Sequence, residues 1–193
     1  DLFIQDYEIH PIDGRMYVAI GTYIIILDAQ SNPSAIDLFE IENSEDEDYI
    51  VDLEMDTQNN RMLVTTDQGF IHSIDLLDTS WNPDLPVEPS GGEWTNTHIA
   101  SNGDLFAFSN SGVFKLNTAG TGWTLEQASS TTNWPAGTPW KTFEHNGVIY
   151  VSILDGGVGR WDVSSMSALS PWSTANNLHS DFISDFAVAG NQL

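Results

Sequence analysis

The stretch HNGVIYVSILDGGVGRWDVS (145–164) contains two short apolar strands that are joined by a glycine turn and preceded by a polar turn. The same plan occurs in IDGRMYVAIGTYIIILDAQ (12–30), QNNRMLVTTDQGFIHSIDLLD (58–78) and SNGDLFAFSNSGVFKLN (101–117), and it begins again in VAGNQL (188–193). The aligned apolar residues are Met16, Met62, Leu105, Ile149 and Leu193, at spacings of 46, 43, 44 and 44. So regular a period indicates a structural repeat.

Each repeat predicts four short antiparallel strands. β-Branched and aromatic residues are enriched in the apolar segments, and no ten-residue helical pattern interrupts them. Four strands in a unit of this length are typical of a β-propeller blade, whose two apolar faces are covered by its neighbours. We therefore expect an all-β β-propeller fragment with four four-stranded blades and the first strand of a fifth. The predicted blades, within a single partial domain over 1–193, are about 1–48, 49–94, 95–140 and 141–182, with the start of the fifth at 183–193.

The weakest part of this pattern is the fourth strand of the second blade. That strand is obscure in NPDLPVEPSGGEW (82–94), where proline recurs. The long linkers between the blades, at 31–49, 79–95, 124–141 and 170–182, are expected to form the binding surface together with the turns between the second and third strands.

The composition is strongly acidic. The chain has 28 Asp and Glu against 5 Lys and Arg, for a net charge of −23. Such a surface repels phosphates, so nucleic acid is excluded as a partner. No apolar run approaches the roughly 18–20 residues that span a bilayer, so no membrane insertion is expected in this segment. With no cysteine and this acidic bias, the chain fits a secreted or cell-surface setting.

Parts of the repeat resemble the two-component-regulator-type β-propeller repeat. That family's repeat has a Trp, an Asn-Gly-Leu loop, Ser or Asp, a first strand with Asp, and a glycine turn before the third strand. The matching residues here are Trp172, Asn177, Leu178, Ser180 and Asp185, then Thr66 and Gly69, then Gly156 and Gly157. Blades two and four match well, whereas the linkers PSAIDLFEIENSEDEDY (33–49) and NPDLPVEPSGGEWTN (82–96) depart from the pattern. The resemblance implies an extracytoplasmic sensor or binding module.

Three aspartates share one register of the predicted first strands. Asp6, Asp52 and Asp185 each lie eight to ten residues before the aligned apolar residue. Because the innermost strand of a blade lines the central channel, these carboxylates could together bind a cation such as Ca²⁺, the one cofactor that the sequence suggests. Thr97 and Lys141 break the series in blades three and four. The alternative is that each aspartate accepts hydrogen bonds from the backbone of a neighbouring blade.

Further candidate binding residues lie in the turns and linkers, where recognition usually resides. Asp67 and Asp155 fall in the turns between the second and third strands. Trp134 and Trp140 lie in the linker GTGWTLEQASSTTNWPAGTPW (120–140) and could stack on a sugar or anchor a peptide. Packing between blades is the alternative for the tryptophans.

The sequence contains no catalytic motif. It has no Gly-x-Ser-x-Gly elbow, and its glycine-rich turns join two strands rather than a strand and a helix. We therefore predict a non-enzymatic binding or sensing module of a larger secreted or cell-surface protein, with a protein or glycan ligand and the remaining blades of a parent propeller as partners. A propeller hydrolase or lyase acting on polysaccharide, and a purely structural scaffold, remain as alternatives.

Overall fold

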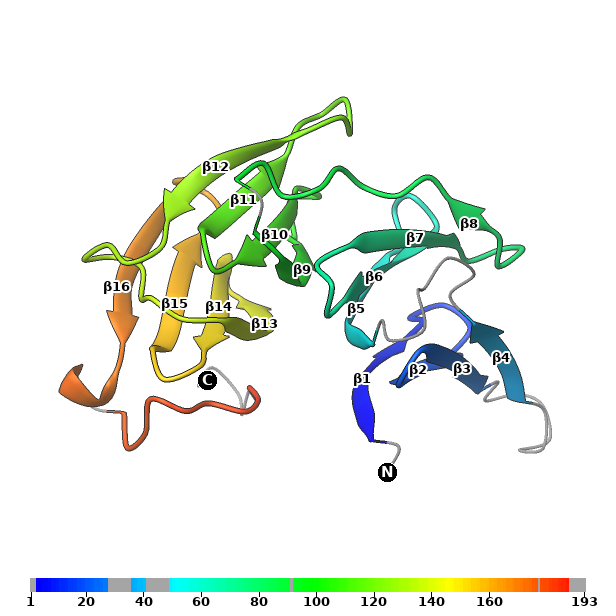
Figure 1. Cartoon of the computed structure of the whole chain (residues 1–193), viewed down its shortest axis with the longest axis horizontal. Coiled ribbons are helices and arrows are strands. Elements are labelled where there is room, and N and C mark those ends of the chain that lie inside the picture. Colours follow the sequence, from blue (N-terminus) through cyan, green and yellow to red (C-terminus); the bar gives the residue numbers. More distant parts are fainter. Residues whose placement is uncertain (1–2, 28–35, 41–48, 91, 177, 188–193) are drawn as a thin grey trace. The chain divides into compact units, whose positions relative to one another are not determined.

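A computed structural model of the chain describes all residues except 1–2, 28–35, 41–48, 91, 177 and 188–193. It forms two compact units, Asp1–Val87 and Glu88–Leu193, each with two four-stranded antiparallel sheets. Within every sheet the strands are neighbours in chain order (Figure 1). One short 3₁₀ helix, η1 (Thr174–Asn176), completes the described secondary structure.

The first unit contains blades one and two. Blade one is made of β1 (Ile4–Ile9), β2 (Met16–Ile20), β3 (Tyr23–Leu27) and β4 (Ile36–Glu40). Blade two is made of β5 (Ile50–Asp56), β6 (Arg61–Thr66), β7 (Ile71–Asp75) and β8 (Trp81–Asn82).

The second unit contains blades three and four. Blade three is made of β9 (Trp94–Ile99), β10 (Leu105–Ser109), β11 (Gly112–Leu116) and β12 (Trp123–Ala128). Blade four is made of β13 (Pro139–His145), β14 (Val148–Ile153), β15 (Gly157–Asp162) and β16 (Ser167–Trp172).

The core of each unit lies between its two sheets. In the first unit, one apolar cluster joins Tyr17 and Ile24 of blade one to Leu53 and Met62 of blade two. In the second unit, the corresponding cluster joins blade three to blade four; its members include Phe106, Phe108, Ile149, Val151 and Trp161. Face-to-face packing of four-stranded meanders is the packing of propeller blades. The predicted fold class, all-β with four blades of the β-propeller type, is confirmed.

Every first strand carries a β-bulge at the same register. The ladder of each blade skips one residue, which is Gln5 in β1, Val51 in β5, Thr95 in β9 and Trp140 in β13. The residues that follow the bulge and share a register are Asp6, Asp52, Asn96 and Lys141. Asn96, and not Thr97 as the sequence suggested, is therefore the blade-three equivalent of Asp6.

The fourth strand of blade two is short and lies earlier than expected. It covers only Trp81–Asn82, immediately before the prolines at 83, 86 and 89. Proline has no N–H to donate to a ladder, so the strand cannot extend through this segment.

The predicted first strand of a fifth blade is not formed in the described residues. Residues 183–187 have no strand assignment, and 188–193 lie outside the described part of the chain. Phe186 nevertheless packs on blade four, with its ring centroid 6.4 Å from that of Phe143 and 6.5 Å from that of Tyr150.

Among the described residues, no helix is long and apolar enough to cross a membrane.

Candidate functional site

The turn between the second and third strands of a blade meets the linker that precedes its first strand. In blade two the N–H of Asp67 donates to the carbonyl of Tyr49 (2.8 Å). In blade four the N–H of Leu154 donates in the same way to the carbonyl of Thr138 (2.9 Å). We call this end of a blade its turn end. The predicted binding residues Asp67, Asp155 and Trp140 lie at the turn ends of blades two and four.

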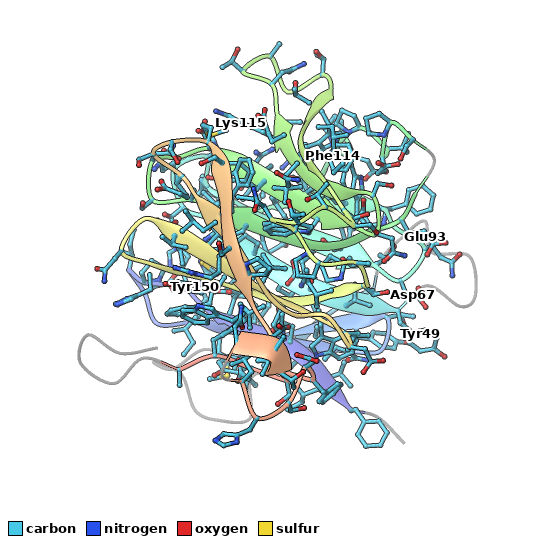
Figure 2. The ribbon with its side chains drawn as sticks, turned by 90° about the vertical axis from the view of Figure 1, so that its left-hand side faces the viewer. Tyr49, Asp67, Glu93, Phe114, Lys115 and Tyr150 are labelled. Carbon is cyan, nitrogen blue, oxygen red and sulfur yellow. The ribbon has the colours of Figure 1, made fainter. Side chains whose placement is uncertain are left out.

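Asp67 has a structural partner at the turn end of blade two. Its side chain is exposed, but Oδ1 accepts the N–H of Tyr49 (2.9 Å). The two residues lie side by side in Figure 2. The carboxylate and the backbone of Asp67 thus both hold the start of β5, so a local structural role accounts for this aspartate.

Asp155 is different, because its carboxylate is unengaged. It lies at the tip of the β14–β15 turn, is exposed, and adopts a φ of 57°, a conformation that aspartate tolerates. No hydrogen bond or ion pair involves its carboxylate in the described part of the chain. By ladder position Asp155 aligns with Gln68 and not with Asp67, since Leu154 makes the backbone contact of Asp67.

The β14–β15 turn is held tightly against the linker before β13. A Cβ added to Gly156 would lie 2.7 Å from the carbonyl oxygen of Ala136, and one added to Gly137 would lie 2.6 Å from that of Leu154. Only glycine permits these close backbone approaches. The position of Asp155 is therefore fixed by backbone packing.

The two predicted tryptophans have opposite environments. Trp134 is 1% exposed and stacks on Phe108, with ring centroids 6.4 Å apart. A Cβ on Gly159 would come within 2.9 Å of its ring. Trp134 is therefore a core residue, and packing between blades replaces its predicted ligand contact. Trp140, the bulge residue of β13, is 49% exposed.

A second exposed aromatic residue, Phe182, lies at the same turn end. It is 56% exposed and follows Asp181, whose carbonyl accepts the N–H of Gly157 (3.0 Å). The carboxylate of Asp181 accepts the backbone N–H and the hydroxyl of Thr174 (2.6 and 2.7 Å). The sequence alone did not single out Phe182, because residues 183–189 read as the apolar start of another strand.

The three aspartates of the predicted cation site differ in exposure and in hydrogen-bond partners. Oδ2 of Asp6 accepts the N–H of Leu53 in blade two (2.9 Å), which is the blade-to-blade role weighed as its alternative. Asp52 is buried, with 4% exposed, and is not free of partners. Asp185 is exposed, and its Oδ1 accepts the N–H of Phe186 (2.8 Å). The described residues hold no group of three or more His, Asp or Glu side chains suited to a metal ion.

A serine, a histidine and a glutamate meet between blades three and four. The backbone N–H and the hydroxyl of Ser101 both donate to Glu144, and Nε2 of His98 lies 3.5 Å from Glu144 Oε2. The nearby His98 ring and the two hydrogen bonds from Ser101 lower the pKa of Glu144 to about 2, against the opposing effect of burial. The serine hydroxyl donates to the carboxylate of Glu144 and not to His98, so this histidine does not activate it as a nucleophile. The cluster ties the β9–β10 turn to β13.

Comparison with known proteins finds similar folds but no protein that is closely related in sequence. No protein-family model and no curated protein matches the sequence. Three similar solved structures are the RRP9 WD40 repeats (TM-score 0.69, 11% identity), the extracellular domain of the putative hybrid two component system BT3049 from B. thetaiotaomicron (0.64, 11%) and streptogramin B lyase (0.62, 13%). The matches cover 91%, 87% and 82% of this chain, respectively.

The chain spans about half the length of the first and third of these proteins, 53% and 51%, and 24% of the second. At such low sequence identity, the likeness is one of architecture. It includes the extracellular domain of a two-component system, which agrees in fold with the repeat resemblance seen in the sequence. The chain is, in fold, a set of β-propeller blades.

Proposed function

We propose that the chain is a non-enzymatic binding or sensing module of a larger secreted or cell-surface protein, and that it contacts a protein or glycan ligand through the turn end of blade four. The observation that carries this proposal is the pairing of an exposed Trp140 with an unengaged Asp155 at one turn end. An exposed indole supplies rigid contact area, and a free carboxylate supplies directional polar contact. Both rest on a packed sheet, as recognition loops usually do.

The extracytoplasmic setting is supported by composition and by one structural likeness. A net charge of −23 suits a surface that stays soluble and repels nucleic acid. The similar structure from B. thetaiotaomicron is described as an extracellular domain.

The outer face of blade one supports the proposal that further blades of a parent propeller are partners. On β1–β3, the side opposite the first unit's core carries only apolar residues and tyrosines. Five of them are exposed by 37–64%: Ile4, Tyr7, Ile9, Tyr23 and Leu27. The other side of the same sheet is covered by blade two. A further four-stranded blade would cover the open side in the same manner.

The test is a combined glycan and peptide array probed with the wild-type chain and three variants. Trp140→Ala and Asp155→Asn should lose any specific signal, whereas Leu125→Ala, a half-exposed apolar residue on β12, should keep it. Equal binding by all four proteins would place recognition elsewhere, and a blank array would count against a binding module. Polysaccharide turnover that is abolished by Asp155→Asn would instead favour a hydrolase or lyase.

A further inference from the structure

Two exposed aromatic residues, Trp140 and Phe182, lie next to the two backbone segments that hydrogen-bond to the β14–β15 turn of blade four. Backbone hydrogen bonds fix the β14–β15 turn on both sides, from Leu154 to Thr138 (2.9 Å) and from Gly157 to Asp181 (3.0 Å). Trp140 lies two residues beyond the first contact, and Phe182 lies one residue beyond the second. The backbone near Trp140 and the backbone near Phe182 are thus each hydrogen-bonded to the turn that carries Asp155. The side chains of Trp140 and Phe182 are 49% and 56% exposed.

Among the described residues next to the β14–β15 turn, Asp155 has a carboxylate without a hydrogen bond or ion pair. The other carboxylate beside the turn, Asp181, is occupied by two hydrogen bonds from Thr174. Lys141 follows Trp140 in β13, but it already has an interaction of its own. The whole chain has 28 acidic and 5 basic residues, so its field concentrates cations at exposed sites.

We propose that this turn end binds an alkylammonium group, with Asp155 as its counter-ion and with Trp140 and Phe182 contacting its methylene or methyl carbons. Aromatic faces attract cations through the ring quadrupole, and a nearby carboxylate adds a Coulombic attraction of its own. A neutral sugar could donate a hydroxyl hydrogen bond to Asp155, but only a cation would also gain the Coulombic attraction of its charge. The inference rests on the proposed function and specifies the chemistry of its ligand.

The test is an NMR titration of the 193-residue chain at low ionic strength. The probe is N-acetyl-lysine methylamide, and its neutral isostere is the corresponding norleucine derivative. Choline serves as a second probe that carries a quaternary ammonium group. Comparing the dissociation constants of the two probes shows whether a lysine side chain or a quaternary ammonium group binds more tightly. We expect saturable shifts at residues 154–157 with an ammonium probe and none with norleucine.

Variants separate a built site from the general negative field. Asp155→Asn and Trp140→Ala should each weaken ammonium binding at least about fivefold. Glu93→Gln removes the same charge from another exposed position of the second unit and should change it less than about twofold. Equal losses in Asp155→Asn and Glu93→Gln, equal binding of norleucine, or no binding of either ammonium probe would overturn the inference. If Trp140→Ala loses a ligand on the array but the wild-type chain binds neither ammonium probe, the proposed function stands and only this inference fails.

Discussion

Among single residues, aspartates and tryptophans of this chain have structural roles at some positions and are exposed at others, depending on their neighbours. Asp6 and Asp67 accept backbone N–H groups, whereas Asp155 is free. Trp134 fills the core between two blades, whereas Trp140 is exposed only six residues later. The sequence could mark all of these as candidates. It could not separate them, because the β-bulge and the close glycine contacts that decide the outcome leave no local signature.

Asp6→Ala should destabilise the first unit. The substitution leaves the N–H of Leu53, which is itself 1% exposed, without its acceptor. Losing one partner of such a bond costs about 1–3 kcal/mol, measurable as a lower urea midpoint. Asp185→Ala is the matched control, since its carboxylate is exposed and bonds only the next residue's N–H. Equal effects of the two substitutions would contradict a role for Asp6 in blade packing.

Glu144 should make the stability of the second unit depend on acid pH. Its pKa falls from an ordinary 4.5 to about 2 because His98 lies close to the carboxylate and Ser101 donates two hydrogen bonds to it. A carboxylate with a lowered pKa in the folded state adds stability above its unfolded pKa, and this stability is lost as the pH falls through the folded pKa. The stability gap between the wild type and Glu144→Gln should therefore be full at pH 6, shrink below about 4.5 and vanish near 2. A gap that stays constant over this range would show that the ionised form is not favoured by folding.

Among the elements, the periodicity of the repeat predicted the number and order of the strands. It did not predict the length of β8 or the β-bulges. The regular spacing predicted four strands for each blade, and all sixteen form. The prolines at 83, 86 and 89 shortened β8, which the pattern had left obscure. The bulge in every first strand was not anticipated, because a one-residue insertion does not disturb the apolar pattern over so short a strand.

Gly157→Ala should be far more damaging than another glycine substitution in the same blade. Gly157 has a φ of 83°, and an added Cβ would lie 2.2 Å from the carbonyl oxygen of Trp172 on β16. Gly147 has a φ of 75° but nothing within 4 Å. Left-handed backbone alone should cost about 1–2 kcal/mol at Gly147, and overpacking should raise the cost at Gly157 to about 3 kcal/mol or more. Similar unfolding midpoints for the two alanine variants would refute the close approach of β15 to β16.

At the scale of the whole molecule, each blade must cover its two faces with something. One face of blade one is covered by blade two, and one face of blade three packs against blade four. The sequence predicted this architecture because strands that are apolar on both faces require neighbours on both sides. The predicted grouping of all blades into one domain, and the cation site at Asp6, Asp52 and Asp185, stay predictions.

The open face of blade one should bind a hydrophobic dye in the 193-residue chain. Tyr7 and Ile9 are 58% and 51% exposed on this face, and contiguous apolar surface of this kind marks an interaction site. Tyr7→Lys combined with Ile9→Lys should lower ANS fluorescence with little loss of stability, and Leu125→Lys should leave the fluorescence unchanged. Strong destabilisation by the double variant without a change in fluorescence would mean that the face is already covered.

If rigid blades present exposed turn ends, amide hydrogen exchange will differ sharply between the strand interiors and the exposed residues of the linkers. We predict the slowest exchange at buried positions of the second strands in all four blades, such as Val18, Val64, Ala107 and Val151. The exposed amides of Thr132, Asn133 and Ala136, in the linker between β12 and β13, should exchange orders of magnitude faster. A second strand that exchanges as fast as these three amides, in any blade, would show that the blade is not rigid.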